Sequence, residues 1–349
     1  MNKILVVGGY GDVGKHVVTE LLTITSGQIV VAGRDGGKAK RLAERLNDAR
    51  VSGMRIDVYD SASYLNKLSG VELVIMCLNP RDTDFSKYCL SESIHYIDIS
   101  PSSQVADGLI DLHDYCKKIA VTGVLGVGLC PGISTLVASD LAASYSHIEK
   151  IDVSLMLGMG DEYGNDSIGW LLANLDHSFT WVKSGTSVKR RPFKDRVHAE
   201  FSPERGSRSA YEFNLADQQI LSRTIEGSDV STYFCYDIRL VTWLVHVMAG
   251  LGVFKLLRFS IPYRVIAKII ELLIKLSKSF ASDYFAINVK ITGRKAGRLV
   301  TETTSFSGTN SARMTGRMVA QTASKLIEEP TEPGVFYLNQ LFQLKDFNV

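Results

Sequence analysis

Residues 3–14, Lys3-Ile-Leu-Val-Val-Gly-Gly-Tyr-Gly-Asp-Val-Gly14, join a short apolar run to a glycine-rich turn. In the segment that follows, Val13, Val17 and Leu21 recur at helical spacing. In the order strand, glycine turn and helix, each glycine has a physical role: a tight turn, a close approach of the backbone to a pyrophosphate, or close packing of the helix on the strand. The stretch therefore predicts a Rossmann-type unit that binds a dinucleotide.

The spacing of the glycines fits two variants of the dinucleotide pattern, GxGxxG from Gly9 and GxxGxxG from Gly8. The N–H groups at the start of the following helix, together with its dipole, favour a bound phosphate. The same turn also matches most of a phosphate loop for nucleoside triphosphates, but His16 stands where that loop needs Ser or Thr to hold magnesium. We therefore predict that the whole turn contacts a dinucleotide: Gly8, Gly9, Tyr10, Gly11, Asp12, Val13 and Gly14.

The second strand ends in Val31-Ala-Gly-Arg-Asp35, about twenty residues after the glycines, where the adenosine ribose is recognised. A carboxylate there accepts from the ribose hydroxyls of NAD, whereas an arginine pairs with the 2′-phosphate of NADP. Arg34 precedes Asp35, and Lys38 and Arg41 follow one and two helical turns later. This cationic cluster favours NADP over NAD. The alternative, that Lys38 and Arg41 only solvate a helix, stays open.

Short β-branched runs alternate with amphipathic segments over the first 125 residues, which is typical of an α/β fold with a doubly wound parallel sheet. The expected strands are 4–7, 29–32, 54–57, 73–77, 96–99 and 119–122. The run GVGLCPG at 126–132 breaks this rhythm. We therefore expect a Rossmann domain over 1–125, completed by the C-terminal helix in 308–349, and an inserted α+β substrate and dimerisation domain over 126–307.

Further strand ends point to the edge at which open α/β sheets bind ligands. We expect Asp57 and Val58 to contact the adenine and Asp98 to face the substrate, although a helix-cap or turn role for Asp98 is an equal alternative. The nicotinamide side is expected at the four residues that end the fourth strand: Cys77, Leu78, Asn79 and Pro80.

Composition excludes several classes of protein. The 349 residues exceed the usual size of one core, and 39 basic against 37 acidic residues give no drive toward nucleic acid. The five cysteines are scattered without a CxxC pair, so neither a disulfide framework nor a metal site is expected, and a cytoplasmic location fits. The uncharged run 240–254 is shorter than the roughly 20 residues that span a bilayer.

The second domain shows weaker patterns. A strand is expected over 150–159, a helix over 166–182, a hairpin from 284–292 and 299–306, and a helix over 310–328. Eight basic residues lie in 183–208, which we interpret as a solvated face or loop, with an anionic ligand or surface as the alternative.

The region 240–280 is the most apolar part of the chain. Its second half predicts a helix with one narrow polar stripe, formed by Arg264, Lys268, Glu271, Lys275 and Lys278. The other faces must be covered in the protein's own core, in a homodimer, or by a peripheral contact with a membrane or lipid. All three remain open from the sequence.

Several motifs together resemble a known family: GGYGDVG at 8–14, VVAGRD at 30–35, VELVIMCLNP at 71–80, HYIDIS at 95–100 and GVGLCPG at 126–132. They are similar to those of the saccharopine dehydrogenase/reductase-like family. The resemblance implies NAD(P) bound on a Rossmann domain, a substrate domain inserted after the sixth strand, and a C-terminal helix that returns to the first domain.

The resemblance also implies a reaction: relatives interconvert an imine and an amine on amino-acid-like or polyamine-like small molecules, and others look like enoyl reductases acting on lipids. Amine-forming members often have an acidic residue before the Pro-Gly of the 126–132 loop, where this chain has Cys130. We keep Cys130 as a candidate substrate contact. No tyrosine is followed by a lysine four residues later, so the proton donor of short-chain dehydrogenases is absent. A dinucleotide-binding protein without turnover is the remaining alternative.

Overall fold

The computed structural model describes residues 2–100, 103–161, 165–183, 186–202, 206–259, 268 and 281–349. The chain divides into two compact units, Met1–Ile133 with Ala312–Val349, and Ser134–Ser311. From the sequence we expect divisions after 125 and 307. The helix predicted over 264–278 lies outside the described residues, apart from Lys268.

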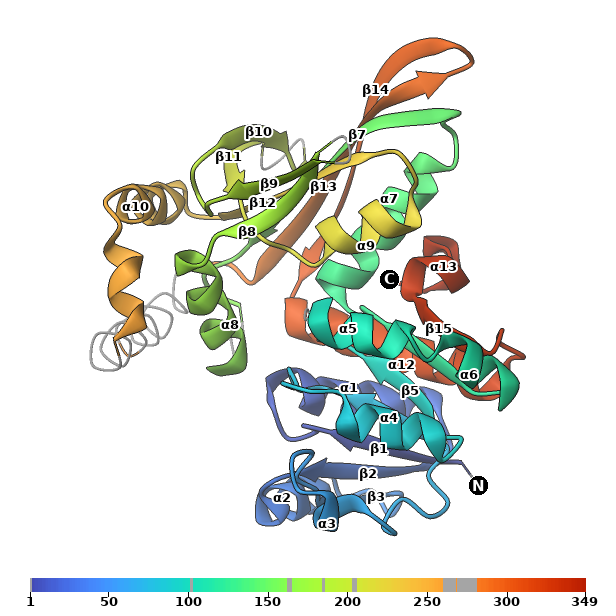
Figure 1. Cartoon of the computed structure of the whole chain (residues 1–349). Helices are drawn as coiled ribbons and strands as arrows, with labels where there is room; N and C mark the ends of the chain where they lie inside the picture. Colours follow the sequence, from blue (N-terminus) through green and yellow to red (C-terminus); the bar gives the residue numbers. More distant parts are fainter. Residues whose placement is uncertain are drawn as a thin grey trace. The chain divides into compact units, whose positions relative to one another are not determined.

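The first unit is built on a seven-stranded parallel sheet with helices packed around it (Figure 1). The strand order is β15-β6-β5-β4-β1-β2-β3. The strands are β1 (Lys3–Val7), β2 (Gln28–Gly33), β3 (Val51–Arg55), β4 (Leu73–Met76), β5 (His95–Asp98), β6 (Thr122–Leu125) and β15 (Gly334–Tyr337). The α/β class with a doubly wound parallel sheet is therefore confirmed.

The order of the strands reverses between β1 and β4, because the chain first builds outward through β2 and β3 and then on the other side through β4, β5 and β6. This reversal is the switch point at which open α/β sheets bind their ligands, outside the carboxyl ends of the strands. The apolar residues of β1 and β4 are fully buried, so the strands that flank the switch point are held rigidly.

The helices of the first unit are α1 (Asp12–Ile24), α2 (Gly36–Leu46), α3 (Ser61–Tyr64), α4 (Asp84–Ser91), α5 (Ser103–Ile110), α6 (His113–Lys118), α12 (Ser311–Glu328) and α13 (Leu338–Leu341). The C-terminal helix α12 packs directly against α1: a Cβ added at Gly316 would lie 2.8 Å from the carbonyl carbon of His16. Residues beyond 311 thus complete the first unit.

Two strands of this sheet differ from expectation. The strand predicted over 119–122 is wrong for its first three residues, because α6 continues to Lys118 and Ala120 takes a left-handed conformation (φ 58°) before β6 begins at Thr122. The edge strand β15 is not predicted from the sequence, since the four residues that follow Pro333 are too few to show the alternation of a strand. The third strand begins and ends earlier than the expected 54–57, so Asp57 lies in the turn after β3.

The second unit contains a six-stranded mixed sheet of order β10-β11-β12-β7-β13-β14 and a two-stranded sheet of β8 and β9. The strands are β7 (His147–Leu157), β8 (Phe179–Lys183), β9 (Thr186–Arg190), β10 (Arg196–Glu200), β11 (Ser207–Glu212), β12 (Asp229–Tyr236), β13 (Tyr284–Lys295) and β14 (Arg298–Thr309). The helical segments are α7 (Ser134–Ala142), α8 (Asn165–Asp176), α9 (Asp217–Thr224), α10 (Arg239–Gly250) and η2 (Val253–Arg258).

The hairpin predicted near the end of this unit is present as β13 and β14, longer than expected because only Ala296 and Gly297 form the turn, both with positive φ. The helix predicted over 166–182 is wrong at its end: α8 stops at Asp176, and the β-branched and aromatic residues of 179–183 pair with β9 instead. Among the described residues, no helix is long and apolar enough to cross a membrane.

Within the basic stretch 183–208, the described residues include β9, β10 and the start of β11, joined in part by turns. Four of its basic side chains are exposed, as expected of a solvated face: Lys189, Arg191, Lys194 and Arg196. Arg190 is different, because it lies over the Trp181 ring at 4.5 Å and its Nη1 is 2.6 Å from Asp195 Oδ2. These partners give Arg190 a structural role in joining β9 to its neighbours.

Candidate functional site

The glycine turn links the carboxyl end of β1 to α1 at the switch point. Gly8 takes a left-handed conformation (φ 78°), and its carbonyl accepts the N–H of Gly11 at 2.9 Å. The N–H groups of Gly8 and Gly9 donate to the carbonyl of Ala32 in β2, at 2.8 and 3.2 Å. Helix α1 begins after Gly11, which has no side chain to cap the first-turn N–H groups, as in anion-binding turns.

Close packing explains why glycines occupy this turn. A Cβ at Gly14 would lie 2.2 Å from the carbonyl oxygen of Gly8, and a Cβ at Gly9 would lie 2.8 Å from that of Val6. A Cβ at Gly8 would meet Leu78 at 2.7 Å, which shows that the segment after β4 lies directly against the turn. At Gly9 and Gly14, no side chain fits without moving backbone.

Tyr10 has a role that sequence reasoning missed. Its ring lies against Gly33, where a Cβ would be 2.6 Å from Tyr10 Cε1, and its hydroxyl accepts the N–H of Asp35 at 3.1 Å. The side chain therefore ties the glycine turn to the end of β2, where the ribose is expected. An aromatic residue inside a glycine turn, paired with a glycine at the end of the second strand, is the pattern that marks this contact.

A pair of substitutions separates the ring of Tyr10 from its hydroxyl. We expect Tyr10→Phe to keep NADPH affinity within about threefold, since water replaces a lost hydrogen bond at an exposed N–H. We expect Tyr10→Ala to weaken NADPH binding roughly tenfold, because the turn and the end of β2 lose their shared packing. Calorimetric titration measures both, and equal affinities for the two variants would contradict this role.

Asp35 caps α2 instead of being free at the end of β2. Its Oδ1 accepts the N–H of Lys38 at 2.9 Å. This backbone hydrogen bond lowers the pKa of Asp35, and the positive charges of Arg41 and Lys38 contribute in the same direction. One oxygen of the Asp35 carboxylate therefore already accepts a backbone hydrogen bond and is less available to a ribose hydroxyl.

Three exposed cations surround the start of α2: Arg34, Lys38 and Arg41. The Arg41 side chain turns back over the first turn of the helix, since a Cβ at Gly37 would be 3.3 Å from its Nη1. Positive charge is therefore concentrated where a 2′-phosphate on the ribose would lie. This arrangement fits the predicted preference for NADP.

Asp57 and Val58 lie in the turn that follows β3. The Asp57 carboxylate accepts the N–H of Tyr59 at 3.2 Å, and the hydroxyl of Ser63 bonds both the N–H and the carbonyl of Asp57. Val58 is buried, so only Asp57 presents its side chain near the surface. The adenine contact stays a prediction for both residues.

The segment 77–80 leaves β4 beside the glycine turn. The N–H of Cys77 donates to the carbonyl of Val7 at 2.8 Å, which keeps the segment aligned with β1. Leu78 is half-buried, Asn79 is exposed and Pro80 is buried. Burial raises the pKa of the Cys77 thiol, and the negative charge of Asp98 raises it further. Cys77 is therefore a neutral thiol at physiological pH.

Asp98 ends β5 and is only 2% exposed. Its Oδ1 accepts the N–H of Ser100 at 2.6 Å, and its Oδ2 accepts the hydroxyl of Tyr96 at 3.1 Å. The hydroxyl of Ser86 in turn donates to that of Tyr96 at 2.8 Å. Burial raises the pKa of Asp98 to about 6. These bonds fit the turn role better than a direct substrate contact, which stays a prediction.

The pKa of Asp98 makes folding stability depend on pH. Its folded-state value of about 6 lies above the ordinary 3.8, so the folded chain binds more protons than the unfolded chain between these values, and stability falls as pH rises through this window. The loss is about 3 kcal/mol or less. We expect Asp98→Asn to remove this fall in urea unfolding measured from pH 4 to 7. An unchanged slope in the variant would contradict the assignment.

The 126–132 loop reaches the same edge of the sheet. The N–H of Val127 donates to the carbonyl of Asp98 at 3.0 Å, and Gly132 takes a positive φ of 131° within the turn η1 (Leu129–Ile133). A Cβ at Gly128 would lie 3.3 Å from Cγ2 of Thr315 in α12. Cys130 is half-buried in this turn, and its substrate contact remains a prediction.

The structure thus brings together the glycine turn, the Cys77 segment, Asp98 and the 126–132 loop at the carboxyl edge of β1, β4, β5 and β6. All five cysteines, each within the described segments, are free of disulfides. Among the described residues, no three His, Cys, Asp or Glu side chains gather as a metal site requires.

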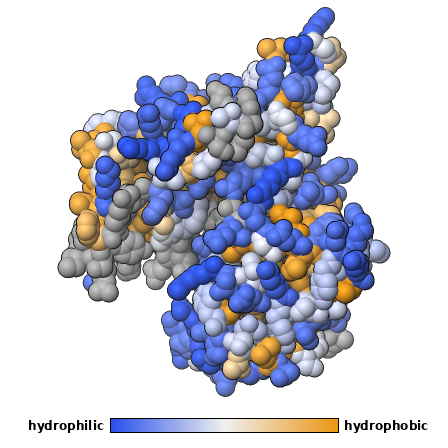
Figure 2. Space-filling view, in the orientation of Figure 1, coloured by the Kyte–Doolittle hydropathy of each residue, from blue (hydrophilic) through white to orange (hydrophobic). Residues whose placement is uncertain are grey.

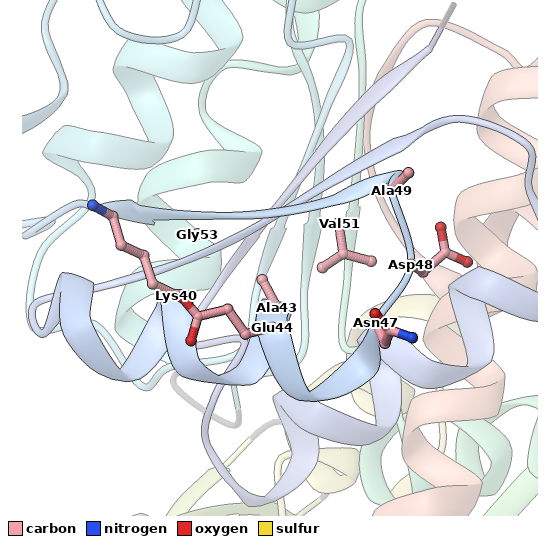
Figure 3. Close-up of a pocket in the computed structure, with 8 residues that line it drawn as sticks. All are labelled: Lys40, Ala43, Glu44, Asn47, Asp48, Ala49, Val51 and Gly53. Atoms are coloured by element: carbon pink, nitrogen blue, oxygen red, sulfur yellow. The ribbon is translucent and has the colours of Figure 1, made fainter.

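A surface pocket of about 560 Å³ lies elsewhere on the first unit, between α2 and β3 (Figure 3). It is lined by Lys40, Ala43, Glu44, Asn47, Asp48, Ala49, Val51 and Gly53. Asp48 is bonded to Arg50, with Oδ2 2.7 Å from Nη2, and this hydrogen bond lowers the pKa of Asp48 to about 2. None of the predicted site residues lines this pocket, so we assign it no role in binding the cofactor.

Comparison with known proteins adds a family and a fold. Residues 4–124 match the family described as the saccharopine dehydrogenase NADP binding domain. Apo saccharopine dehydrogenase (L-Glu forming) from Saccharomyces cerevisiae has a similar structure, with a TM-score of 0.66, 15% sequence identity and coverage of 97% of this chain and 94% of that one. An engineered D-amino acid dehydrogenase is similar at a TM-score of 0.51, 10% identity and coverage of 98% and 95%.

The two structural likenesses, at these identities, show a shared fold over nearly the whole chain. The family match supports an NAD(P)-dependent oxidoreductase, and it confirms the resemblance and the choice of NADP as cofactor predicted from the sequence. Residues 4–124 thus match the NADP-binding domain of the saccharopine dehydrogenase family.

Proposed function

We propose that the protein is an NADP(H)-dependent oxidoreductase that transfers hydride to or from the C=N or CH–NH carbon of an amino-acid-like or amine substrate. The main support is the glycine turn before α1, which has no side-chain cap, together with the three cations at the start of α2. Both lie within the residues that match an NADP-binding family. We further propose that 134–311 is the substrate domain.

Each part of the carboxyl edge has a separate role in this proposal. The N–H groups after the glycine turn bind the pyrophosphate, and Arg34 pairs with the 2′-phosphate. Leu78, Asn79 and Pro80 orient the nicotinamide side, because Leu78 lies against Gly8. When bound, the cofactor supplies the hydride, and the chain supplies position and the exclusion of water.

The choice of bond and substrate is supported by the resemblance of the motifs and by the names of two proteins with a similar fold, a saccharopine dehydrogenase and a D-amino acid dehydrogenase. Cys130 stands where amine-forming relatives often carry an acid. A cysteine side chain holds an ammonium group more weakly than a carboxylate does. We therefore propose an amino-acid-like substrate other than saccharopine.

The test is a screen for oxidation of NADPH, followed by its absorbance, with pairs of amino acids and keto acids against enoyl thioesters. We expect turnover with members of the first set and none with the second. Turnover with enoyl thioesters alone would favour a reductase of lipid-like C=C bonds. Binding of NADPH without turnover in either set would favour a dinucleotide-binding protein that is not an enzyme.

A further inference from the structure

Exposed apolar side chains are concentrated on one short part of the second unit. Eleven large apolar or aromatic side chains are exposed in the described chain, and six of them lie between 240 and 259. They are Leu240 (61% exposed), Trp243 (53%), Leu244 (44%), Leu251 (76%), Leu256 (49%) and Phe259 (64%). We call this set the α10 patch. Figure 2 shows apolar residues gathered at this end of the unit.

The α10 patch is held in place by the opposite side of its helix. The Thr242 hydroxyl accepts the N–H of Tyr236 at 2.9 Å and donates to its carbonyl at 3.3 Å. Four residues after Thr242, the ring of His246 stacks on that of Tyr211, with 4.4 Å between the ring centroids. The Nδ1 of His246 is 2.7 Å from the carbonyl oxygen of Phe193. Helix α10 is thereby fixed on β11 and β12, at the edge of the unit in Figure 1.

The outward side chains follow helical spacing. Trp243 and Leu244 lie three and four residues after Leu240, and Leu251 lies seven after Leu244, so all four project from one face of α10 and its C-cap. A rigid helix with a buried polar side and an outward apolar face is what an interfacial helix needs, with a tryptophan able to sit at the level of the headgroups. Contiguous exposed apolar patches of this kind mark sites of interaction.

The charge around the α10 patch identifies its partner. No acidic residue occurs from 238 to 259, and Arg239 and Lys255 are exposed cations. The whole chain carries a net charge of only +2, so positive charge is concentrated beside the patch. Apolar side chains with exposed cations at both ends of the segment match a surface with acyl chains below and negative headgroups above.

We infer that the α10 patch docks the protein on an anionic phospholipid surface. The leucines, Trp243 and Phe259 enter the boundary between headgroups and acyl chains, and Arg239 and Lys255 pair with the negative headgroups. Binding is peripheral, in keeping with the absence, among the described residues, of a helix that could span a bilayer. The inference does not depend on the reaction that the first unit supports.

The test is flotation of the full-length chain with vesicles of phosphatidylcholine alone and of phosphatidylcholine with about 30% phosphatidylserine. We expect binding to the anionic vesicles that weakens at high salt and is weak without phosphatidylserine. Leu240→Asp should reduce this binding roughly tenfold or more, since a charge replaces an inserted apolar side chain. Lys255→Gln should reduce it about fivefold.

Leu299→Asp is the matched control, because Leu299 is equally exposed (62%) but lies on β14, far from the patch in sequence. It should bind anionic vesicles as the parent does. Equal losses for Leu240→Asp and Leu299→Asp, or no binding of the parent, would overturn the inference. A third contradicting result is a parent protein that sediments as a dimer, that Leu240→Asp converts to a monomer, and that binds vesicles in neither form. Thermal melting establishes that each variant is folded.

Discussion

Gly14→Ala is expected to abolish NADPH binding and to lower the free energy of unfolding by several kcal/mol. The added methyl would lie 2.2 Å from the carbonyl oxygen of Gly8 and 2.7 Å from the Cα of Gly9. Both contacts are backbone atoms, so the strain cannot be relieved by rotating a side chain. The turn must open or α1 must move away from β1, and overpacking of this kind costs about 1–3 kcal/mol or more.

Two controls make this result informative. Gly250→Ala, in α10, meets nothing within 4 Å and should leave NADPH affinity unchanged and stability within about 1 kcal/mol. Gly11→Ala is the milder variant of the turn: its Cβ would be 3.1 Å from the Gly8 oxygen, and its backbone (φ −74°) suits any residue. It should fold and still bind NADPH more weakly. Normal NADPH affinity in Gly14→Ala would contradict the site.

Arg34→Ala is expected to raise the Kd for NADPH by roughly 10- to 100-fold and to leave the Kd for NADH unchanged. A charge-assisted hydrogen bond to a phosphate is worth about 1.5–3 kcal/mol, and NADH has no 2′-phosphate with which Arg34 can pair. Arg34 is exposed after β2, so stability should not change. The selectivity of Arg34→Ala for NADPH over NADH should therefore fall by the same factor as its affinity for NADPH.

Lys40→Ala is the control for this experiment, because Lys40 is an exposed cation of the same helix region that lies in the α2 and β3 pocket instead of at the start of α2. It should leave both affinities as they are. Equal weakening of NADPH and NADH by Arg34→Ala would point to a general effect on the site, and an unchanged Kd or KM for NADPH would show that Arg34 does not read the 2′-phosphate.

The sequence allows the first unit to be predicted well because its determinants are local. The glycine turn, the strand before it and the helix after it are contiguous, and each has a periodicity that survives without tertiary contacts. The cations at 34, 38 and 41 are also neighbours along the chain. The sheet that results differs from expectation mainly at β6 and β15, where short strands depend on the context of their partners.

Contacts between distant parts of the chain could not be predicted from the sequence. The Tyr10 hydroxyl meets Asp35 across 25 residues, and the link from Ser86 through Tyr96 to Asp98 depends on how α4 packs on β5. Asp35 itself has the right identity for reading a ribose, yet it caps α2. In the second unit, the end of the helix predicted over 166–182 is a strand because pairing with β9 outweighs local helical spacing.

The central claim is that the first unit binds NADP(H) through the glycine turn and the cations of α2. Calorimetric titration of the full-length chain with NADPH and, separately, with NADH tests it most directly. The account predicts one NADPH per chain, bound at least about tenfold more tightly than NADH. Binding of neither dinucleotide, or tighter binding of NADH, would contradict it.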